Sequence, residues 1–341
     1  MTDARTAARA DFLARCGWGG AAVAPLAADA SFRSYHRVRR GPDGAVLMDA
    51  PPPREDVRPF RAIDRRLIAF GLSAPAILAE DVDSGFLLLE DFGDGTFTRL
   101  LREGADETAL YDLAVDTLIA LHRAPGAADD PPEMPLPVYD AARYLAEAAL
   151  LPDWFLPAAG TALPAGARES WDAAWREALA ALDGQPQTLV LRDFHVDNLM
   201  RLPGRQGVAA CGLLDFQDAV RGPALYDLMS LLEDARRDIA PALAARGKAR
   251  YRAAFPQLAG FDAAWAVLAA QRHAKVIGIF ARLAVRDGKP GYLPHIPRVW
   301  RLFEAALAHP ALAAVAAWTA AFVPEAPRRR PPCPPQTRTC A

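Results

Sequence analysis

The stretch that decides the fold is Leu189-Val-Leu-Arg-Asp-Phe-His-Val-Asp-Asn-Leu-Met200, followed by Gly212-Leu-Leu-Asp-Phe216. It places Asp193, then Asn198, and then Asp215 at the end of an apolar run. Phosphoryl transfer uses one carboxylate to orient the attacking hydroxyl, and an amide oxygen and a second carboxylate to hold Mg²⁺ against nucleotide phosphates. The sequence therefore predicts an ATP-dependent small-molecule kinase with Asp193 as the catalytic residue and with Asn198 and Asp215 as metal ligands.

Length and charge narrow the class of protein. A chain of 341 residues is long enough for two lobes, and 52% hydrophobic and 23% charged residues are ordinary for a globular enzyme. The net charge of −2 argues against a nucleic-acid partner. The four cysteines show no metal-binding or redox spacing, so neither a zinc site nor a disulfide framework is expected.

The ends of the chain point to a cytoplasmic location. The N-terminus lacks the apolar stretch of a signal peptide, and the apolar segment Ala308–Val323 is short and interrupted by Pro310. We therefore expect no membrane association, and nothing in the sequence predicts an obligate protein partner.

The first part of the chain predicts a small antiparallel sheet with one helix packed on it. After an N-terminal helix over Asp3–Cys16, the expected elements are two strands within Pro25–Arg40, a strand at Ala45–Met48, a helix over Arg58–Phe70, and strands at Ile77–Leu78 and Phe86–Glu90. Residues 1–93 are predicted to be a nucleotide-binding lobe, with a hinge at 89–93.

The rest of the chain predicts a larger, mainly helical lobe over residues 94–323, which contains the catalytic loop and the acceptor site. Helices are expected over Glu107–Arg123, Asp140–Leu150, Arg168–Leu182, Tyr226–Arg237, Ala242–Phe255, Asp262–Asp287 and Arg298–Ala308. Short strands at Leu189–Leu191 and Cys211–Leu214 flank the catalytic loop. Residues 324–341 are rich in Pro and Arg and are predicted to be disordered.

Nucleotide contacts are expected in the first lobe although it has no Gly-x-Gly-x-x-Gly motif. A turn that includes Ser31, Phe32 and Arg33 takes its place, and backbone N–H groups there can bind phosphate oxygens. Because the first lysine of the chain is residue 248, we expect the Arg33 guanidinium to supply the cation; an ordinary surface arginine is the alternative. Backbone groups of Glu90 and Phe92 are expected to pair with the adenine edge, or else simply to end a buried strand.

These motifs together resemble the aminoglycoside phosphotransferase and choline kinase superfamily, over roughly residues 20–310. The resemblance implies an α+β, protein-kinase-like bilobal fold, with ATP and Mg²⁺ bound. In that family the loop usually reads His-Gly-Asp-x-His-x-x-Asn, so Leu191 here replaces a histidine. Met48 stands where such kinases place a phosphate-binding lysine.

A narrower resemblance is to the bacterial anomeric kinases of peptidoglycan recycling. It is carried by Asp29–Tyr35, Met48–Pro51, Leu88–Asp91 and Leu231–Arg237. It implies an amino-sugar substrate, N-acetylmuramate and/or N-acetylglucosamine, phosphorylated on the anomeric C1 hydroxyl. His195 is then expected to contact the sugar or to hold the loop. Arg236 is expected to meet an acidic substituent of the sugar, unless it lies on a solvated helix face.

Two other functions stay open at this point. One is a kinase of the same superfamily that acts on an aminoglycoside or another hydroxyl acceptor. The other is a non-catalytic ATP-binding module, suggested by the missing glycine loop and lysine. The presence of Asp193, Asn198 and Asp215 together argues against the non-catalytic module, because ATP binding alone does not require all three.

Overall fold

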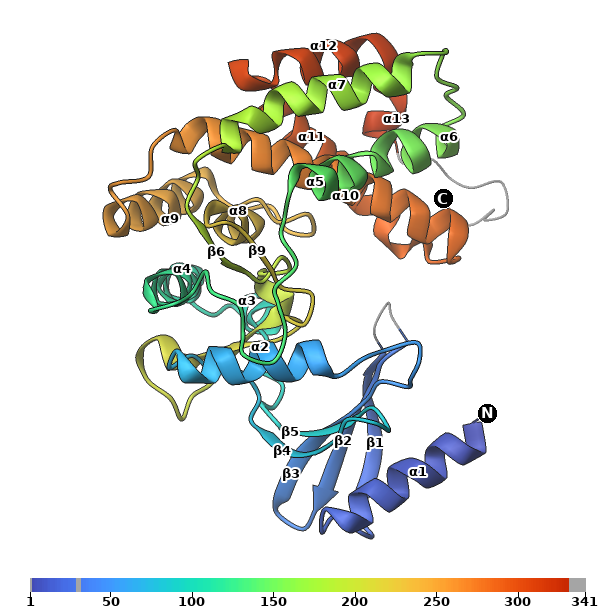
Figure 1. Ribbon diagram of the computed structural model, residues 1–341, viewed down its shortest axis with the longest axis vertical. Coiled ribbons are helices and arrows are strands. Elements are labelled where there is room, and N and C mark those ends of the chain that lie inside the picture. Colours follow the sequence, from blue (N-terminus) through green and yellow to red (C-terminus); the bar gives the residue numbers. More distant parts are fainter. Residues whose placement is uncertain (1, 29–31, 331–341) are drawn as a thin grey trace. The chain divides into compact units, whose positions relative to one another are not determined.

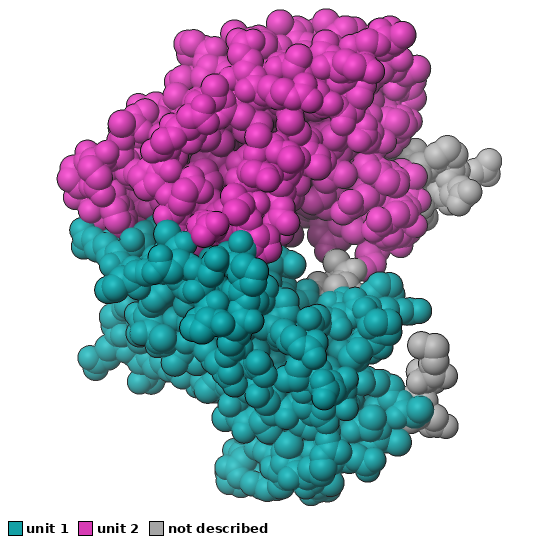
Figure 2. Space-filling model, in the orientation of Figure 1, with its two compact units in different colours: residues 1–136, 196–219 teal, residues 137–195, 220–341 magenta. Residues whose placement is uncertain are grey.

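The computed structural model describes residues 2–28 and 32–330, and the chain divides into two compact units (Figure 2). Unit 1 comprises Met1–Leu136 and Val196–Ala219, and unit 2 comprises Pro137–His195 and Val220–Ala341. The chain thus passes from unit 2 into unit 1 within the predicted catalytic loop, directly after His195.

Unit 1 is built on a five-stranded antiparallel sheet in the order β1-β2-β3-β5-β4 (Figure 1). The strands are β1 (Ala22–Ala28), β2 (Ser34–Arg40), β3 (Asp43–Asp49), β4 (Ile77–Asp81) and β5 (Phe86–Glu90), and the helices beside them are α1 (Thr2–Arg15) and α2 (Arg58–Ala69). The predicted sheet and its two helices are therefore confirmed. Their bounds shift by a few residues at most ends, and by three at the start of β1 and the end of β4.

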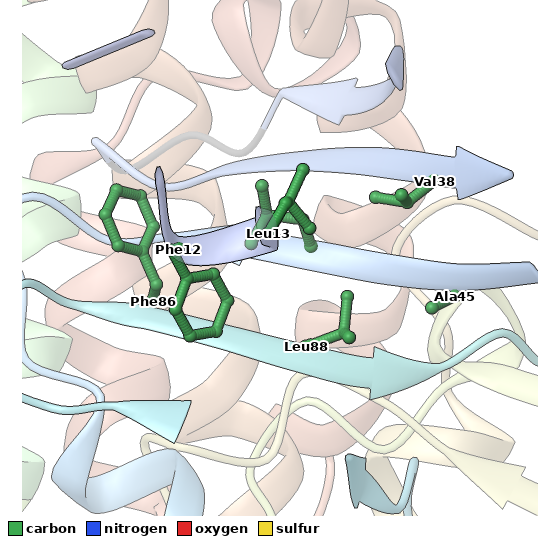
Figure 3. Packing of buried hydrophobic residues seen from close by; sticks show 7 residues of the cluster. Phe12, Leu13, Val38, Ala45, Phe86 and Leu88 are labelled. Atoms are coloured by element: carbon green, nitrogen blue, oxygen red, sulfur yellow. The ribbon is translucent and has the colours of Figure 1, made fainter. Parts of the chain in front are cut away.

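One face of this sheet packs against α1. Side chains alternate along a strand, so Val38, Ala45 and Leu88 point to the same face. Figure 3 shows these residues packed with Phe12 and Leu13 of α1. The rings of Phe12 and Phe86 stack with centroids 5.4 Å apart, which fixes the helix against the sheet.

The other face of the sheet carries Tyr35 of β2, Val46 of β3 and Leu89 of β5, as the strand register requires. Helix α2 lies on this side, where Phe60 contributes to the same cavity as these three residues. The Phe60 ring also contacts Phe216, with centroids 4.7 Å apart, so that the helix is joined to the segment that follows Asp215.

The remaining elements of unit 1 lie beyond the predicted lobe boundary at residue 93. They are α3 (Phe97–Arg102), α4 (Glu107–Arg123), β7 (Leu199–Arg201), β8 (Cys211–Leu213), and the 3₁₀ turns η3 (Val196–Asn198) and η4 (Gly207–Ala210). Strands β7 and β8 form a hairpin that bridges to Ser73 and Thr96. These backbone contacts explain why the compact unit extends past residue 93, whereas the functional division there stays a prediction.

Unit 2 is mainly helical. Its helices are α5 (Ala141–Ala148), α6 (Leu156–Ala158), α7 (Ala167–Leu179), α8 (Leu225–Leu232), α9 (Pro241–Ala254), α10 (Phe261–Arg286), α11 (Ile296–Leu307), α12 (Ala313–Phe322) and α13 (Glu325–Arg329). Shorter helical segments are η1 (Leu151–Phe155), η2 (Ala180–Leu182), η5 (Pro290–His295) and η6 (Pro310–Leu312), and the strands are β6 (Gln187–Val190) and β9 (Val220–Pro223).

Helix α10 is the longest helix of unit 2, and most of its side chains are buried. A Cβ at Gly278 would collide with the backbone of Leu150, so glycine is required where α10 packs against η1. Strand β6, which precedes the predicted catalytic loop, pairs with β9. The loop is therefore anchored to this unit at its start.

Two expectations differ from the structure. Helix α8 ends at Leu232, so Arg236 does not lie on a helix. The reason is a tertiary contact: the carboxylate of Glu233 bonds Trp265 and His273 on α10. Residues 325–329 form α13 although the tail was expected to be disordered, because Arg328 bonds the carbonyls of α12. Residues 331–341 lie outside the described part of the chain.

Among residues 2–28 and 32–330, no single helix has both the length and the apolar character needed to cross a membrane. The segments Pro290–Leu307 and Pro310–Phe322 pass that test only when taken together, and they are bent by 111°.

Candidate functional site

Unit 1 contains a cavity of about 420 Å³ on the sheet face opposite α1. It is lined by Leu26, Tyr35, Val46, Phe60, Pro75, Leu89, Glu90, Asp91, Phe92, Gly93, Asn198, Met200, Leu214 and Asp215. The structure thus brings four of the predicted site residues together in one pocket: Glu90, Phe92, Asn198 and Asp215. Apolar walls with a few polar groups are typical of a site for a small ligand.

The predicted hinge is held in place by the β7–β8 hairpin. Arg205, in the loop of the hairpin, pairs with the Glu90 carboxylate at 2.5 Å and lies over the Phe92 ring, 5.3 Å from its centroid. The backbone N–H of Glu90 donates to the Ala76 carbonyl at 2.9 Å. Glu90 can therefore offer a ligand its carbonyl oxygen but not its N–H group, which leaves an N–H contact to Phe92.

Gly212 on β8 makes room for the Phe92 ring. A Cβ added at this glycine would lie 2.8 Å from two ring carbons of Phe92 and 3.1 Å from the Met200 Cβ. Phe92 and Met200 both line the cavity, so a larger residue at position 212 must displace one of them.

We therefore expect Gly212→Ala to raise KM for ATP by about 5- to 150-fold, because overpacking a filled site costs about 1–3 kcal/mol. Steady-state kinetics with each substrate varied in turn would check this, and KM for the acceptor should stay nearly constant. Gly204→Ala, in the same hairpin but with open space around its added Cβ, is the matched control. Equal effects of the two substitutions would contradict the assignment of Phe92 to the nucleotide site.

Asn198 and Asp215, which both line the cavity, approach each other. The Asn198 Nδ2 lies 3.3 Å from Asp215 Oδ2, and Gln217 Nε2 donates to Asp215 Oδ1 at 2.9 Å. Asp215 has a left-handed backbone with φ 59°, which only a well-determined surrounding structure maintains in a residue with a side chain. The N–H of Leu214 donates to the Asn198 carbonyl at 3.0 Å, so the two side chains are held by one local network.

This pair fits Mg²⁺ rather than a transition metal. In the described residues no cluster of three or more His, Cys, Asp or Glu is placed to hold a metal ion. Mg²⁺ needs only oxygen ligands, and it is commonly bound through one or two carboxylates together with substrate phosphates and water. One carboxylate and one amide oxygen beside a nucleotide-sized cavity meet that requirement.

The β1–β2 turn places its predicted residues differently. Ser31 lies outside the described residues, and Phe32 and Arg33 are not among the residues that line the cavity. The Phe32 side chain is exposed, and its N–H donates to Glu55 Oε1 at 2.9 Å. Arg33 is buried, and its Nε lies 3.7 Å from Glu55 Oε2.

The predicted catalytic loop begins in unit 2 with a constrained backbone. Arg192 has φ 70°, and its N–H donates to Asp227 Oδ1 at 2.9 Å. The N–H of Leu191 donates to the other carboxylate oxygen of Asp227 at 2.6 Å, and the Leu191 side chain is buried. Asp227 on α8 thus ties the loop to the helix, and Leu191 packs in the core.

Asp193 is about half exposed, with its Oδ1 3.5 Å from Arg272 Nη2. Partial desolvation by the surrounding protein raises the pKa of Asp193, but the charges of Arg272, Lys275 and Arg192 outweigh this effect and lower the pKa to about 2. The carboxylate is therefore ionised throughout the neutral range. A base this weak is suited to orienting a hydroxyl and accepting its proton late in the reaction.

His195 and Arg236, the two residues proposed for the acceptor, lie together in unit 2. Arg236 Nη1 is 3.4 Å from His195 Nε2, and the Arg236 N–H donates to Asp234 Oδ1 at 2.7 Å. Burial and the charge of Arg236 lower the pKa of His195. A guanidinium only donates, so Nε2 accepts and the hydrogen of a neutral imidazole is on Nδ1. That nitrogen is buried and has no partner in the described residues.

Sequence reasoning missed two residues that support the site, Gln217 and Arg272. Gln217 follows Asp215 by two residues, and nothing in the sequence pattern marks it as a site residue. Arg272 could have been noticed, since it lies with Gln271, His273 and Lys275 in the middle of a mainly apolar helix. Charged residues at the centre of such a helix are buried and must be paired, which marks them as structural or functional.

Sequence comparison finds relatives over most of the chain. A model of the phosphotransferase enzyme family matches residues 22–261. The N-acetylmuramate/N-acetylglucosamine kinase of Caulobacter vibrioides is 37% identical over 361 residues, which cover 96% of this chain and 99% of that protein. The protein of the same name from Pseudomonas aeruginosa is 40% identical over 309 residues, with 86% of each chain covered.

Solved structures share the fold at low identity. A putative aminoglycoside phosphotransferase from Ralstonia eutropha superposes with a TM-score of 0.61 and 17% identity, covering 92% of this chain and 98% of that one. A choline/ethanolamine kinase family protein from Mesorhizobium loti gives a TM-score of 0.58 at 17% identity, with the same coverage. At this identity the similarity is one of fold alone.

Proposed function

Because this chain belongs to the phosphotransferase enzyme family, we propose that it transfers the γ-phosphoryl group of ATP to the anomeric hydroxyl of N-acetylmuramate or N-acetylglucosamine. The family makes the chain an ATP-dependent phosphotransferase with a hydroxyl acceptor. The amino sugar, the C1 position and a role in peptidoglycan recycling are our proposal. It is supported by relatives named for these two sugars that match nearly the whole chain.

The observation that carries the proposal is the cavity of unit 1, in which Asn198 and Asp215 meet the predicted hinge residues Glu90 and Phe92. In this proposal the adenine lies between Val46, Met200 and the other apolar walls. Its edge pairs with the Glu90 carbonyl and the Phe92 N–H. The triphosphate then extends toward Asn198 and Asp215, which would hold a Mg²⁺ ion.

The proposed reaction is an in-line displacement. The C1 hydroxyl oxygen, oriented by Asp193, bonds to the γ-phosphorus while the bond from phosphorus to the β–γ bridging oxygen breaks and ADP leaves. The hydroxyl proton passes to Asp193 and from this half-exposed carboxylate to water. When Mg²⁺ is bound, it neutralises charge on the phosphate oxygens.

We propose that the phosphates also meet Arg33, because residues 1–247 contain no lysine. The guanidinium of Arg33 is buried just before the start of β2, and its Nε lies 3.7 Å from Glu55 Oε2. Arg37, on the cavity face of β2, is already paired with Asp91 and Asp94 at 2.8 Å each. Arg33 is the cation that we propose for the phosphates, and Ser31 is a further proposed contact.

Arg33→Met is expected to weaken binding of ADP by about 10- to 100-fold, because an arginine–phosphate hydrogen bond is worth about 1.5–3 kcal/mol. Binding of adenosine, which has no phosphate, should be unchanged. Isothermal titration calorimetry with both ligands checks the difference, and Arg58→Met, an exposed arginine in the same unit, serves as the control. Equal weakening of adenosine would show that Arg33 acts through the fold.

On the acceptor side we propose that His195 and Arg236 contact the sugar. Arg236 is the cation suited to a carboxylate substituent, and only N-acetylmuramate of the two sugars carries one. Arg236→Met should therefore reduce kcat/KM for N-acetylmuramate more than for N-acetylglucosamine.

The proposed function is tested by ADP release with a panel of acceptors: the two N-acetylated sugars, glucose, galactose, kanamycin and choline. We expect turnover with the N-acetylated sugars and at least 100-fold lower kcat/KM with the others, about the discrimination that a binding site achieves by hydrogen bonds. A higher kcat/KM with kanamycin or choline would contradict the proposed amino-sugar substrate and identify that compound's class as the acceptor instead. Turnover of no acceptor at all would favour a non-catalytic ATP-binding module.

A further inference from the structure

Arg192, the residue before Asp193, is fixed at three points by three helices. Its N–H donates to Asp227 of α8 at 2.9 Å, and its carbonyl accepts from Arg272 Nη1 of α10 at 2.9 Å. Its own guanidinium donates to Glu147 of α5 at 2.6 Å. A left-handed backbone costs energy for any residue other than glycine, so these contacts maintain a conformation that the loop would otherwise leave.

Of the two charged side chains that hold the Arg192 backbone, Arg272 also approaches the Asp193 carboxylate. One guanidinium nitrogen, Nη1, contacts the Arg192 carbonyl and the Tyr226 hydroxyl at 3.1 Å, and the other, Nη2, lies 3.5 Å from Asp193 Oδ1. The Arg272 side chain is 8% exposed and that of Asp193 is 46% exposed. The buried Arg272 guanidinium thus acts on the accessible Asp193 carboxylate in two ways. It holds the backbone of the preceding residue, Arg192, and its charge attracts the carboxylate itself.

We propose that Arg272 is a positioning residue for phosphoryl transfer, which sets the orientation of the Asp193 carboxylate. This inference rests on the proposed catalytic role of Asp193. Arg272 acts on the reaction only through Asp193 and the loop, so its contribution should disappear when the carboxylate is absent. A residue that only stabilises the fold would show no such dependence.

The test is a double-mutant cycle in kcat, with Arg272→Met and Asp193→Ala made singly and together. Arg272→Met alone is expected to lower kcat by about 10- to 100-fold, which is the usual effect of misplacing a reacting group by about 1 Å. Added to Asp193→Ala, it should lower kcat by less than about 3-fold, since residues that act as a unit are not additive. KM for ATP should stay within about 3-fold in every variant.

The inference would be overturned if Arg272→Met lowered kcat by the same factor with Asp193 present and with Asp193→Ala. A wild-type kcat in the Arg272→Met single variant would also overturn it. A normal rate in Asp193→Ala would instead overturn the catalytic role on which it rests, so the two failures are distinct. Arg286→Met is the matched control, because this exposed arginine of α10 pairs with its neighbour Asp287. If Arg272→Met does not fold, Arg272→Lys, which keeps the charge, enters the same cycle with its melting temperature measured.

Discussion

Replacing Asp193 with alanine is expected to lower kcat by about 10²–10⁴-fold, the usual loss when a positioned general base is removed. KM for ATP should change by less than about 3-fold, because Asp193 is not among the residues that line the nucleotide-sized cavity. Stopped or continuous assays of ADP release, with each substrate varied in turn, separate the effect on kcat from the effect on KM.

The control for Asp193→Ala is Asp197→Asn, which changes a carboxylate of the same loop. Asp197 is bonded by Thr98, so its side chain is occupied within unit 1. We expect a loss of less than about 10-fold in this variant, as for the removal of one ordinary hydrogen bond. An Asp193→Ala enzyme that retained more than a third of its kcat would show that another group orients the acceptor.

Replacing Asp215 with asparagine is expected to lower kcat by about 10²–10⁴-fold, since a catalytic metal supplies several kcal/mol and each 1.36 kcal/mol is a factor of ten. Unlike Asp193→Ala, it should also raise the Mg²⁺ concentration for half-maximal rate by at least about tenfold. A titration of activity with MgCl₂ at saturating ATP measures this shift.

Asp218→Asn provides the comparison for Asp215, because Asp218 is exposed and also receives a contact from Gln217, at 3.3 Å. The Asp218→Asn enzyme should reach its half-maximal rate at the same Mg²⁺ concentration as the wild type. If Asp215→Asn and the wild type require the same Mg²⁺ concentration, Asp215 does not hold the ion, whatever its effect on kcat.

The fold was predictable where hydrophobic periodicity is strong. Helix α4 has the predicted bounds, Glu107–Arg123, and α10 differs from its prediction by one residue at each end. The protein-kinase-like fold and the family resemblance are confirmed by the comparisons. Helix α12 was not predicted, because its Ala-rich sequence carries little amphipathic signal and its place depends on Trp318 packing against Trp171 of α7.

The candidate site was predictable only in its local part. The order Asp, Asn, Asp along one loop and one strand indicated the chemistry, and the structure places Asn198 beside Asp215. The partners that orient these groups come from distant segments: Arg272 is 79 residues from Asp193. Spacing along the chain does not reveal such contacts. The end of α8 was misjudged for the same reason, because Glu233 is drawn toward α10 by a tertiary contact.

The decisive measurement is NMR of the product formed from N-acetylglucosamine, ATP and Mg²⁺ by the wild-type chain. A proton–phosphorus correlation spectrum should show the new phosphate coupled to the proton on C1, and no such product should form with Asp193→Ala at the same enzyme concentration and time. Coupling of phosphorus to the C6 protons instead, or ATP that stays intact, would contradict the proposal that this chain is an anomeric amino-sugar kinase.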